Sequence, residues 1–498
     1  MTEKKGDGDA TAKNNSSNKV WKRPVKRSFT GAAAANAAAA AVRSRSSQKS
    51  SRSSLTLAPK ASNAINSQNP TPASLEIVPD EALGNILGRI SDGRMLARCA
   101  GVCRRWRRVC RQVPVLKLVL RKMQAWQAEG VISAALLERK GLRDFEVRFV
   151  CPRKYASEGV RESRVFGCLW RLSSSIETLA LICPNTVYFK LWTWLAKFPR
   201  LLSLKIHCGR IEENPLNNCL NQLRRCEFSR TIIAEPMLED LVKFSPVLEE
   251  LVVVGCDPIE SLALESSSLR YLNLVATEEY PMKSLELLTL GLKDLYICHV
   301  EELQVNGYEL VHLGIYSACQ PRISSLHHLL SLEMDGKGWA LESIEHIVCA
   351  AQVVRHLVIK ASISETRPLR IEHYLSPMFC LQAVILESNL LECFCRGFAE
   401  IPFDGDEPVF ALKKVAVKLS EETRDCTGLL KALVSYCPDL QILVVDTTEL
   451  ELGNLSELQQ LKDQEQSPQR RVLLYSDPKD QRLVKEIAEI LAADSKKV

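Results

Sequence analysis

Residues 75–122 read LEIVPDEALGNILGRISDGRMLARCAGVCRRWRRVCRQVPVLKLVLRK and begin with the pattern of a short amphipathic helix. Pro79 followed by Asp80 and Glu81 is typical of a helix start, where exposed N–H groups and the helix dipole favour acidic side chains. The apolar residues that follow recur at helical spacing and predict one stripe, formed by Leu83, Ile86, Leu87 and Ile90.

A second helix is predicted after Ser91-Asp92-Gly93, which breaks the first one. Its apolar residues are Leu96, Cys99, Val102, Cys103 and Trp106. Two helices of this length bury little surface by themselves, so we expect another protein to complete much of the stripe.

This stretch resembles an F-box, because Pro79, the Leu-Ala-Arg-Cys run at 96–99 and Trp106 stand where members of that family carry them. In the family, the module docks on a Skp-type adaptor, which connects it to a cullin ubiquitin ligase, and the resemblance implies the same partners here. The residues expected at the adaptor interface are Pro79, Leu83, Ile86, Leu87, Ile90, Leu96, Val102, Cys103 and Trp106. The alternative is a helical cap at 79–111 that only packs on the next domain.

The whole chain has the composition of a folded protein of two or three domains, since its 498 residues are 46% hydrophobic. No window approaches 18 uninterrupted apolar residues, and the first ten residues lack the charged-then-apolar order of a signal peptide. The 18 cysteines are scattered through apolar segments, where free cysteine behaves as a small hydrophobe. We expect an intracellular protein, in the nucleus, the cytoplasm or both, with reduced thiols and no membrane partner.

Residues 1–70 differ from the rest in charge. They hold 13 Lys and Arg against 3 Asp and Glu, a net charge of +10, so residues 71–498 carry +6 minus +10, or −4. The segment has few large apolar groups to offset ordering entropy, and we expect a disordered basic tail. Two basic pairs around Pro24 fit a nuclear-import signal or a contact with an anionic surface; a solvated tail without a specific partner is the alternative.

Beyond residue 175, the pattern apolar-x-x-apolar-x-apolar indicates a leucine-rich repeat, because its last two apolar residues alternate as in a strand. Eight of the eleven intervals between successive repeats fall within the roughly 20–29 residues of this class. The predicted repeats are Ile176-Leu179-Leu181, Leu201-Leu204-Ile206, Leu223-Cys226-Phe228, Leu248-Leu251-Val253, Leu269-Leu272-Leu274, Leu292-Leu295-Ile297, Leu310-Leu313-Ile315, Leu329-Leu332-Met334, Val354-Leu357-Ile359, Leu381-Val384-Leu386, Leu412-Val415-Val417 and Leu440-Leu443-Val445.

The segments between these strands predict two kinds of connection. Helical runs that end before a proline occur at 191–198, 238–244 and 429–436, since proline stops a helix. Shorter connections in the middle of the array carry a second strand-like pattern: Ile259-Leu262-Leu264, Leu285-Leu288-Leu290 and Val300-Leu303-Val305. The longest interval contains an acidic insertion at 403–408, which we expect to be an exposed loop.

These patterns predict an α/β protein in which an N-terminal three-helix F-box is followed by a leucine-rich-repeat solenoid. We expect a curved parallel sheet with helices and short strands on the convex side. The predicted boundaries are a disordered basic tail at 1–70, the F-box at 71–122, a linker and N-terminal cap of the solenoid at 123–175, the repeats at 176–448, and a C-terminal cap and tail at 449–498.

The apolar residues of each repeat are predicted to face the core, so the residues between them face the concave side of the sheet. Tyrosine combines a large contact area with a polar tip, and the tyrosines at 271, 296 and 316 are predicted to form a strip across neighbouring repeats. The candidate substrate-binding residues are Tyr271, Asp294, Tyr296, His312, Tyr316 and Glu333. The alternative is that any repeat surface carries such residues by composition alone.

The sequence contains no catalytic motif of the GxSxG, P-loop or HExxH kind. Cys99 with Cys103, and Cys393 with Cys395, lack a second Cys or His pair at zinc spacing. We therefore expect a non-catalytic protein without a metal or other cofactor. The arginines around Trp106 favour docking on an acidic adaptor over binding nucleic acid, because F-boxes keep basic residues beside this tryptophan.

An N-terminal F-box followed by leucine-rich repeats resembles the plant type of F-box/leucine-rich-repeat protein, as do repeat ends such as Tyr436-Cys437-Pro438-Asp439-Leu440. The resemblance implies the substrate receptor of a Skp-cullin-F-box ubiquitin ligase, whose repeats bind an unidentified protein substrate for ubiquitination. The alternative is a non-catalytic repeat scaffold or nucleic-acid-associated protein that uses the basic tail and the arginines. A small-molecule ligand, as in hormone-sensing members, is disfavoured because no pocket-lining set can be matched residue by residue.

Overall fold

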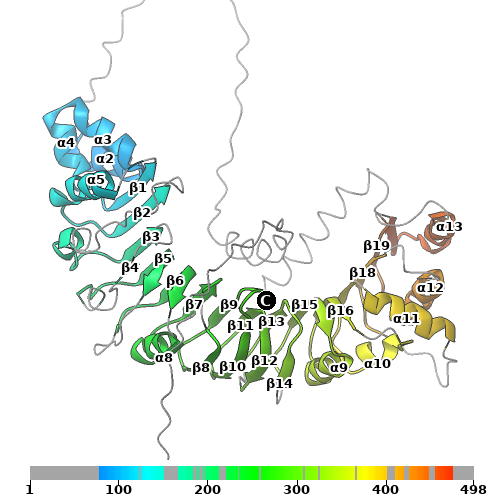
Figure 1. Ribbon diagram of the computed structural model, residues 1–498. Helices are drawn as coiled ribbons and strands as arrows, with labels where there is room; N and C mark the ends of the chain where they lie inside the picture. The colour runs from blue at the N-terminus through cyan, green and yellow to red at the C-terminus, as the bar shows by residue number, and fades with distance from the viewer. Residues whose placement is uncertain are drawn as a thin grey trace, which may run out of the picture. The chain divides into compact units, whose positions relative to one another are not determined.

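The computed structural model describes residues 78–474 except 122, 124, 151–166, 183–187, 190–194, 196, 212–219, 234, 257–258, 307–308, 324–325, 365–366, 388, 401–409, 420–425 and 448–454 (Figure 1). All described residues belong to one compact unit, Pro59–Val498. The predicted basic tail, the acidic insertion at 403–408 and the residues after 474 lie outside the described ranges.

Three short helices open the described part of the chain, as predicted for an F-box: α2 (Asp80–Gly88), α3 (Gly93–Val102) and α4 (Arg104–Cys110). Helix α2 begins directly after Pro79, with acidic residues in its first turn. Asp92 caps α3, since its carboxylate accepts hydrogen bonds from the backbone N–H groups of Arg94 and Met95 at 2.7 and 3.4 Å.

A parallel sheet of 16 strands follows these helices; all of them except β4, which pairs only with β5, pair in chain order. This sheet confirms the predicted leucine-rich-repeat solenoid. Its strands are β1 (Val115–Arg121), β2 (Asp144–Val150), β3 (Thr178–Ile182), β4 (Tyr188–Phe189), β5 (Ser203–Ile211), β6 (Arg225–Ile233), β7 (Glu250–Val254), β9 (Tyr271–Val275), β11 (Asp294–Cys298), β13 (His312–Ile315), β15 (Ser331–Trp339), β16 (His356–Ile363), β17 (Ala383–Leu386), β18 (Lys414–Lys418), β19 (Ile442–Asp446) and β20 (Arg471–Leu474).

The predicted repeat residues form the core between this sheet and the elements behind it. No member of the twelve predicted triplets is more than 3% exposed. Neighbouring strands pair in register, so equivalent residues such as Leu272, Leu295 and Leu313 stack on one another along the solenoid. The residues between them consequently line the opposite face of the sheet.

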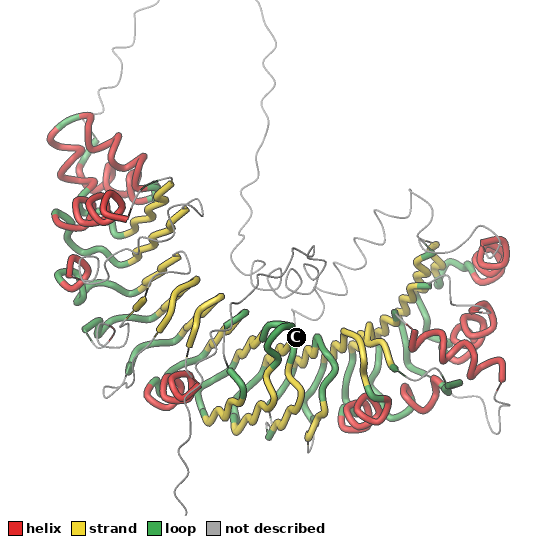
Figure 2. The backbone as a smooth tube through the Cα atoms, in the orientation of Figure 1, coloured by secondary structure: helices red, strands yellow, loops and turns green. Residues whose placement is uncertain are grey.

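Helices and a second sheet cover the core from the other side (Figure 2). The second sheet is parallel, has the order β14-β12-β10-β8, and lies behind the middle of the array. The described helices are α5 (Ala125–Leu137), α8 (Glu235–Phe244), α9 (Leu341–Ala350), α10 (Ile371–Leu375), α11 (Asn389–Glu400), α12 (Cys426–Tyr436) and α13 (Leu455–Glu465), and the strands of the second sheet are β8 (Ser261–Glu265), β10 (Met282–Leu288), β12 (Val300–Val305) and β14 (Gln320–Ile323). The predicted helices at 238–244 and 429–436 are confirmed, whereas most of 191–198 lies outside the described residues.

The predicted register of β10 is wrong. Leu288 and Leu290 were expected in the core, but they are 43% and 58% exposed. The buried residues of this strand are Met282, Leu285 and Leu287. Leu287 pairs with residues of β8 and β12 that also face the core, so the neighbouring strands set the register.

The long sheet extends beyond the predicted repeat range on both sides, because β1 and β2 precede it and β20 follows it. The segment 123–175, expected to be a linker and cap, supplies α5 and β2. The F-box is joined directly to this sheet: the backbone N–H of Lys117 in β1 donates to the Ser91 carbonyl at 2.8 Å. Gly93 permits the close approach, since a Cβ there would lie 2.4 Å from the Leu118 side chain.

Candidate functional site

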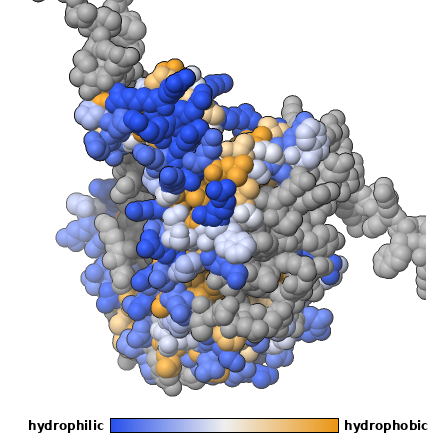
Figure 3. All heavy atoms as spheres, turned by 90° about the vertical axis from the view of Figure 1, so that its left-hand side faces the viewer, coloured by the Kyte–Doolittle hydropathy of each residue, from blue (hydrophilic) through white to orange (hydrophobic). Residues whose placement is uncertain are grey.

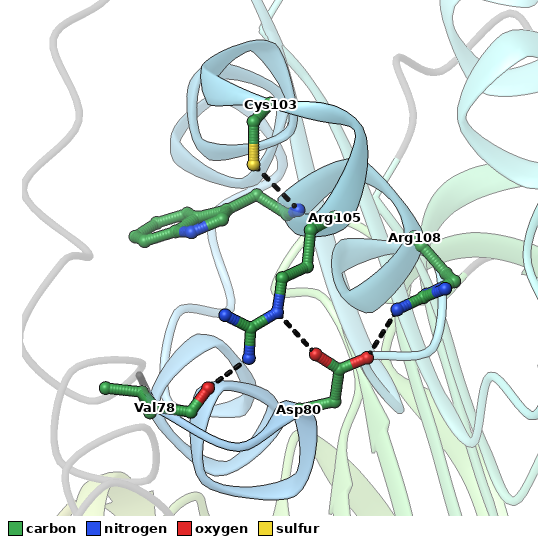
Figure 4. A network of polar contacts seen from close by, with 6 residues as sticks. Val78, Asp80, Cys103, Arg105 and Arg108 are labelled. Carbon is green, nitrogen blue, oxygen red and sulfur yellow. Dashed lines mark hydrogen bonds and ion pairs between the residues drawn. The ribbon is translucent and has the colours of Figure 1, made fainter. Parts of the chain in front are cut away.

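Asp80, in the first turn of α2, binds two arginines of α4 (Figure 4). The Nε of Arg105 donates to one carboxylate oxygen at 2.6 Å, and Nη2 of Arg108 donates to the other at 2.7 Å. Arg105 also donates to the carbonyl oxygen of Val78. Hydrogen bonds from Arg105 and then Arg108 lower the pKa of Asp80, so this carboxylate is charged at neutral pH. We call this arrangement the Asp80 clamp; it fastens the start of α2 to α4.

Three residues predicted at the adaptor interface lie in the chain's own core. Leu83, Leu87 and Leu96 are each 1% exposed. They belong to one apolar cluster with Val109 of α4 and Leu116 of β1. Another protein was expected to complete much of the stripe, but α4 and the first strand of the sheet already cover Leu83 and Leu87 within the chain.

Other apolar side chains of the F-box do face solvent. Ile86 on α2 is 53% exposed, and Met95 and Val102 on α3 are 52% and 65% exposed. Met95 and Val102 are seven residues apart and lie on one face of α3. Sequence reasoning missed Met95, although its spacing to Cys99 and Val102 was the available signal. Of the remaining predicted residues, Pro79 and Cys103 are exposed, while Ile90 and Trp106 are half-buried against the core.

The arginine-rich stretch around Trp106 is largely committed to contacts within the protein. Arg105 and Arg108 bind Asp80, and Arg111 binds Glu138 of the turn after α5. Figure 3 shows hydrophilic residues gathered at the top of the face that it views, with a hydrophobic strip directly below them. Pairing of this kind reduces the positive charge available to a nucleic acid.

The six predicted substrate-binding residues lie together in the middle of the long sheet, on or next to β11, β13, β9 and β15. We call them the tyrosine cluster. Parallel pairing places residues of neighbouring strands side by side on one face. One row holds Tyr271, Asp294 and His312, the next holds Tyr296, Gly314 and Glu333, and Tyr316 follows β13 directly.

Aromatic rings lie next to one another within this cluster. The ring centroids of Tyr271 and Tyr296 are 5.8 Å apart, with the rings tilted by 45°. A Cβ added at Gly314 would lie 2.8 Å from the Tyr296 ring and 3.1 Å from that of Tyr316, so both rings lie close over this glycine. The predicted strip of tyrosines is therefore present. The role of Gly314 was missed, although a glycine inside a predicted strand indicates a close approach.

The polar groups of the cluster are arranged around the tyrosines. The hydroxyl of Tyr316 donates to Oε2 of Glu333 at 2.9 Å, and Nε2 of His312 lies 3.8 Å from Oδ1 of Asp294. Burial, together with the charge of Glu333, raises the pKa of Tyr316 above its ordinary value. This phenol consequently remains a neutral hydrogen-bond donor throughout the physiological pH range.

Asn273 is a further polar residue at this place that sequence reasoning did not select as a site residue. It pairs in register with Tyr296 and is 1% exposed. Its Oδ1 has no hydrogen-bond partner in the structure as described. Asn273 therefore places a buried, unpaired amide oxygen at the strand position next to Tyr296.

Within the described ranges, no group of three or more His, Cys, Asp or Glu side chains is placed to hold a metal ion. Fourteen cysteines whose side chains the structure describes are free thiols. Burial raises the pKa of Cys298 to about 11 and that of Cys437 to about 12, which suits packing better than nucleophilic chemistry. None of the helices that the structure describes has the length and apolar character needed to cross a membrane.

Residues 75–116 match an F-box-like domain. The match covers the three helices α2, α3 and α4 and the beginning of β1. No curated protein matches the chain. Among solved structures, an internalin of Listeria monocytogenes is similar at 14% sequence identity with a TM-score of 0.30, over 64% of this chain and 85% of the internalin. The chain combines an F-box-like domain with a leucine-rich-repeat solenoid, the latter on the evidence of its strand order and buried repeat residues.

Proposed function

We propose that this protein is the substrate-recognition subunit of a Skp-cullin-F-box ubiquitin ligase, similar to the plant F-box/leucine-rich-repeat type. The observation that supports this role is the F-box-like domain at 75–116, which exposes Ile86, Met95 and Val102 although its leucines are buried in the chain's main core. Exposed large apolar side chains on a small module are typical of a protein contact. The contact expected from the family is a Skp-type adaptor, which would link the chain to a cullin.

The tyrosine cluster is the proposed substrate-binding site. Tyrosine rings and the carboxylates of Asp294 and Glu333 lie there on one face of the sheet, on successive strands. A lysine or arginine side chain fits such a site, because its charge is attracted to aromatic faces and its N–H groups can satisfy the carboxylates. We therefore propose a protein substrate that presents a basic segment. The protein positions this substrate, and ubiquitin transfer belongs to other subunits.

The adaptor contact is tested by placing carboxylates on the exposed apolar surface. Ile86→Asp with Val102→Asp should weaken binding of a Skp-type adaptor by more than a hundredfold. Each side chain is about half exposed, so its replacement removes about 1 kcal/mol of the binding free energy that its burial against the adaptor would contribute. Each desolvated, unpaired carboxylate adds about 1–3 kcal/mol, and about 1.4 kcal/mol corresponds to tenfold in affinity. Affinity is measured by titration of the purified adaptor.

The matched control is Asn85→Asp with Ala97→Asp, which adds the same charges at exposed positions of the same two helices. This control should bind the adaptor within threefold of the unaltered protein. Equal adaptor binding by both variants would contradict the proposed surface. Binding of nucleic acid rather than adaptor would favour a nucleic-acid-associated scaffold, a role that the pairing of Arg105, Arg108 and Arg111 with acidic side chains makes less favourable.

A further inference from the structure

A pocket lies where the F-box meets the first strand of the sheet and helix α5. Its floor includes the buried side chains of Leu116 and Leu118 in β1. Its walls include small residues of α3 and α5, such as Ala100 and Ala134, and larger side chains there would fill the space. The pocket has a volume of about 310 Å³. This value lies at the lower end of the range of about 300–1,000 Å³ that is typical of small-molecule sites.

Three arginines line this pocket and give it a positive charge. Arg107 and Arg111 come from α4 and its C-terminal end, and Arg139 comes from the segment after α5. Glu138 is the only carboxylate among the described residues that line the pocket. Three guanidinium groups against one carboxylate leave a net charge of +2. The pocket therefore attracts an anion.

Arg139 carries the strongest sign of a ligand. It is half-buried, and its guanidinium donates from Nε to the carbonyl oxygen of Ala135 at 3.2 Å and from Nη1 to that of Val113 at 3.1 Å. No acidic side chain of the described ranges binds it. Burial lowers the pKa of Arg139, as expected for a cation that loses hydration. A guanidinium has five N–H donors, so three donors of Arg139 remain for a bound anion.

Arg107 and Arg111 complete the positive side of the pocket. Nε of Arg107 donates to the carbonyl oxygen of Ala100 at 3.4 Å, and Arg111 forms an ion pair with Glu138. Each contact holds a guanidinium group in place and leaves other N–H donors of that group for a ligand. Planar guanidinium groups bind carboxylates and phosphates through paired hydrogen bonds.

We propose that this pocket binds a small organic oxyanion, a carboxylate or a phosphate ester, whose short apolar body packs against the alanines and leucines. Arg139 binds the anionic group, with Arg107 and Arg111 beside it. A small molecule is the expected occupant rather than a partner protein, because the charged and apolar groups meet within one pocket. A protein partner would instead need an extended surface, typically about 800 Å² on each side.

The inference goes beyond the proposed function and does not depend on it. The exposed side chains proposed to contact the adaptor, Ile86, Met95 and Val102, do not line the pocket. A ligand in the pocket would contact α3 of the F-box together with β1 and α5. Its binding should therefore slow hydrogen exchange in peptides from these three elements and leave exchange in β18 and β19 unchanged.

The test is calorimetric titration of the purified full chain with octanoate, octyl phosphate and octanol. At least one of the two oxyanions should bind at one site per chain, and the tighter one shows which anionic group the pocket prefers. Octanol has the same apolar body without the charge and should bind at least tenfold more weakly. Inorganic phosphate lacks the apolar body and should also bind at least tenfold more weakly. Failure of both oxyanions to bind overturns the proposal, and so does equal binding of octanol or of inorganic phosphate.

Variants locate the bound oxyanion. Arg139→Gln should weaken its binding at least tenfold, because a hydrogen bond between charged groups is lost. Arg98→Gln removes the same charge from an exposed position of α3 outside the pocket and should leave the affinity within twofold. Circular dichroism checks that each variant is folded.

A second pair of variants keeps all three arginines. Ala134→Leu fills part of the pocket and should weaken oxyanion binding at least tenfold. Val131→Leu enlarges an exposed apolar side chain of the same helix outside the pocket and should bind normally. This pair decides the matter even if Arg139→Gln fails to fold. Equal oxyanion affinities of Ala134→Leu and Val131→Leu overturn the proposed site.

Discussion

Truncation of two neighbouring residues of α2 should change the stability of the protein by very different amounts, because one residue belongs to the core and the other to the surface. Leu87 is 1% exposed, whereas Ile86 is 53% exposed. Leu87→Ala removes a fully buried side chain and leaves a cavity, which costs about 2–5 kcal/mol of stability. Ile86→Ala should change stability by about 0.5 kcal/mol or less, as is usual for surface positions.

The assay is native-state hydrogen exchange of peptides from α2 and α4, since a repeat array need not unfold in one step. A loss of about 2 kcal/mol should accelerate exchange at least ~30-fold in Leu87→Ala. Exchange in Ile86→Ala should stay within about threefold, while its adaptor binding falls. Equal exchange in the two variants would refute the division of this helix into a core face and a docking face.

Two further predictions concern the Asp80 clamp and the tyrosine cluster. Because Arg105 and Arg108 lower the pKa of Asp80, its charge stabilises the fold above the ordinary value of 3.8, and this contribution is lost as the pH falls through the lowered pKa. The protection of α2 amides, taken relative to the intrinsic exchange rate at each pH, should fall on such acidification. Asp80→Asn should have lower protection at neutral pH and lack this acid step. An identical pH profile in both proteins would contradict the clamp. Gly314→Ala places a Cβ 2.8 Å from the Tyr296 ring and should weaken binding of a lysine-rich peptide at least tenfold in a fluorescence titration. Gly130→Ala, whose Cβ meets nothing within 4 Å, is the control and should bind the peptide normally.

Most of the solenoid could be predicted because its pattern repeats. Each strand supplies two alternating core residues such as Leu272 and Leu274, and a register error in one repeat would conflict with its neighbours. The error at β10 arose because the spacing of its own leucines does not decide the register. There a leucine run, 285–290, offers more than one alternation, and only pairing with β8 and β12 selects Leu285 and Leu287.

The division of the F-box between core and surface could not be predicted from its own helices. Helical spacing shows that Leu83 and Leu87 share a stripe, but it does not show which partner covers them. The element that covers them includes β1, whose place at the start of the sheet depends on its pairing with β2, where Leu116 pairs with Phe145. The tyrosine cluster was found because side chains at equal positions of successive repeats must be neighbours. Gly314 and Asn273 were not selected because their importance follows from contacts rather than from residue type.

The hydrogen bond between Lys117 and Ser91 ties the F-box to the first strand, and seven strand-to-strand steps then lead from β1 to β11. At about 4.8 Å a step, the path along the sheet is about 34 Å. Because backbone pairing sets this distance, the separation between the F-box and the tyrosine cluster is constant, unlike one set by a flexible linker. If the proposed function holds, the receptor cannot change this length to bring a distant substrate lysine into position for ubiquitination. The choice of ubiquitination site would then be made by the substrate, through the spacing between its bound basic segment and its lysines.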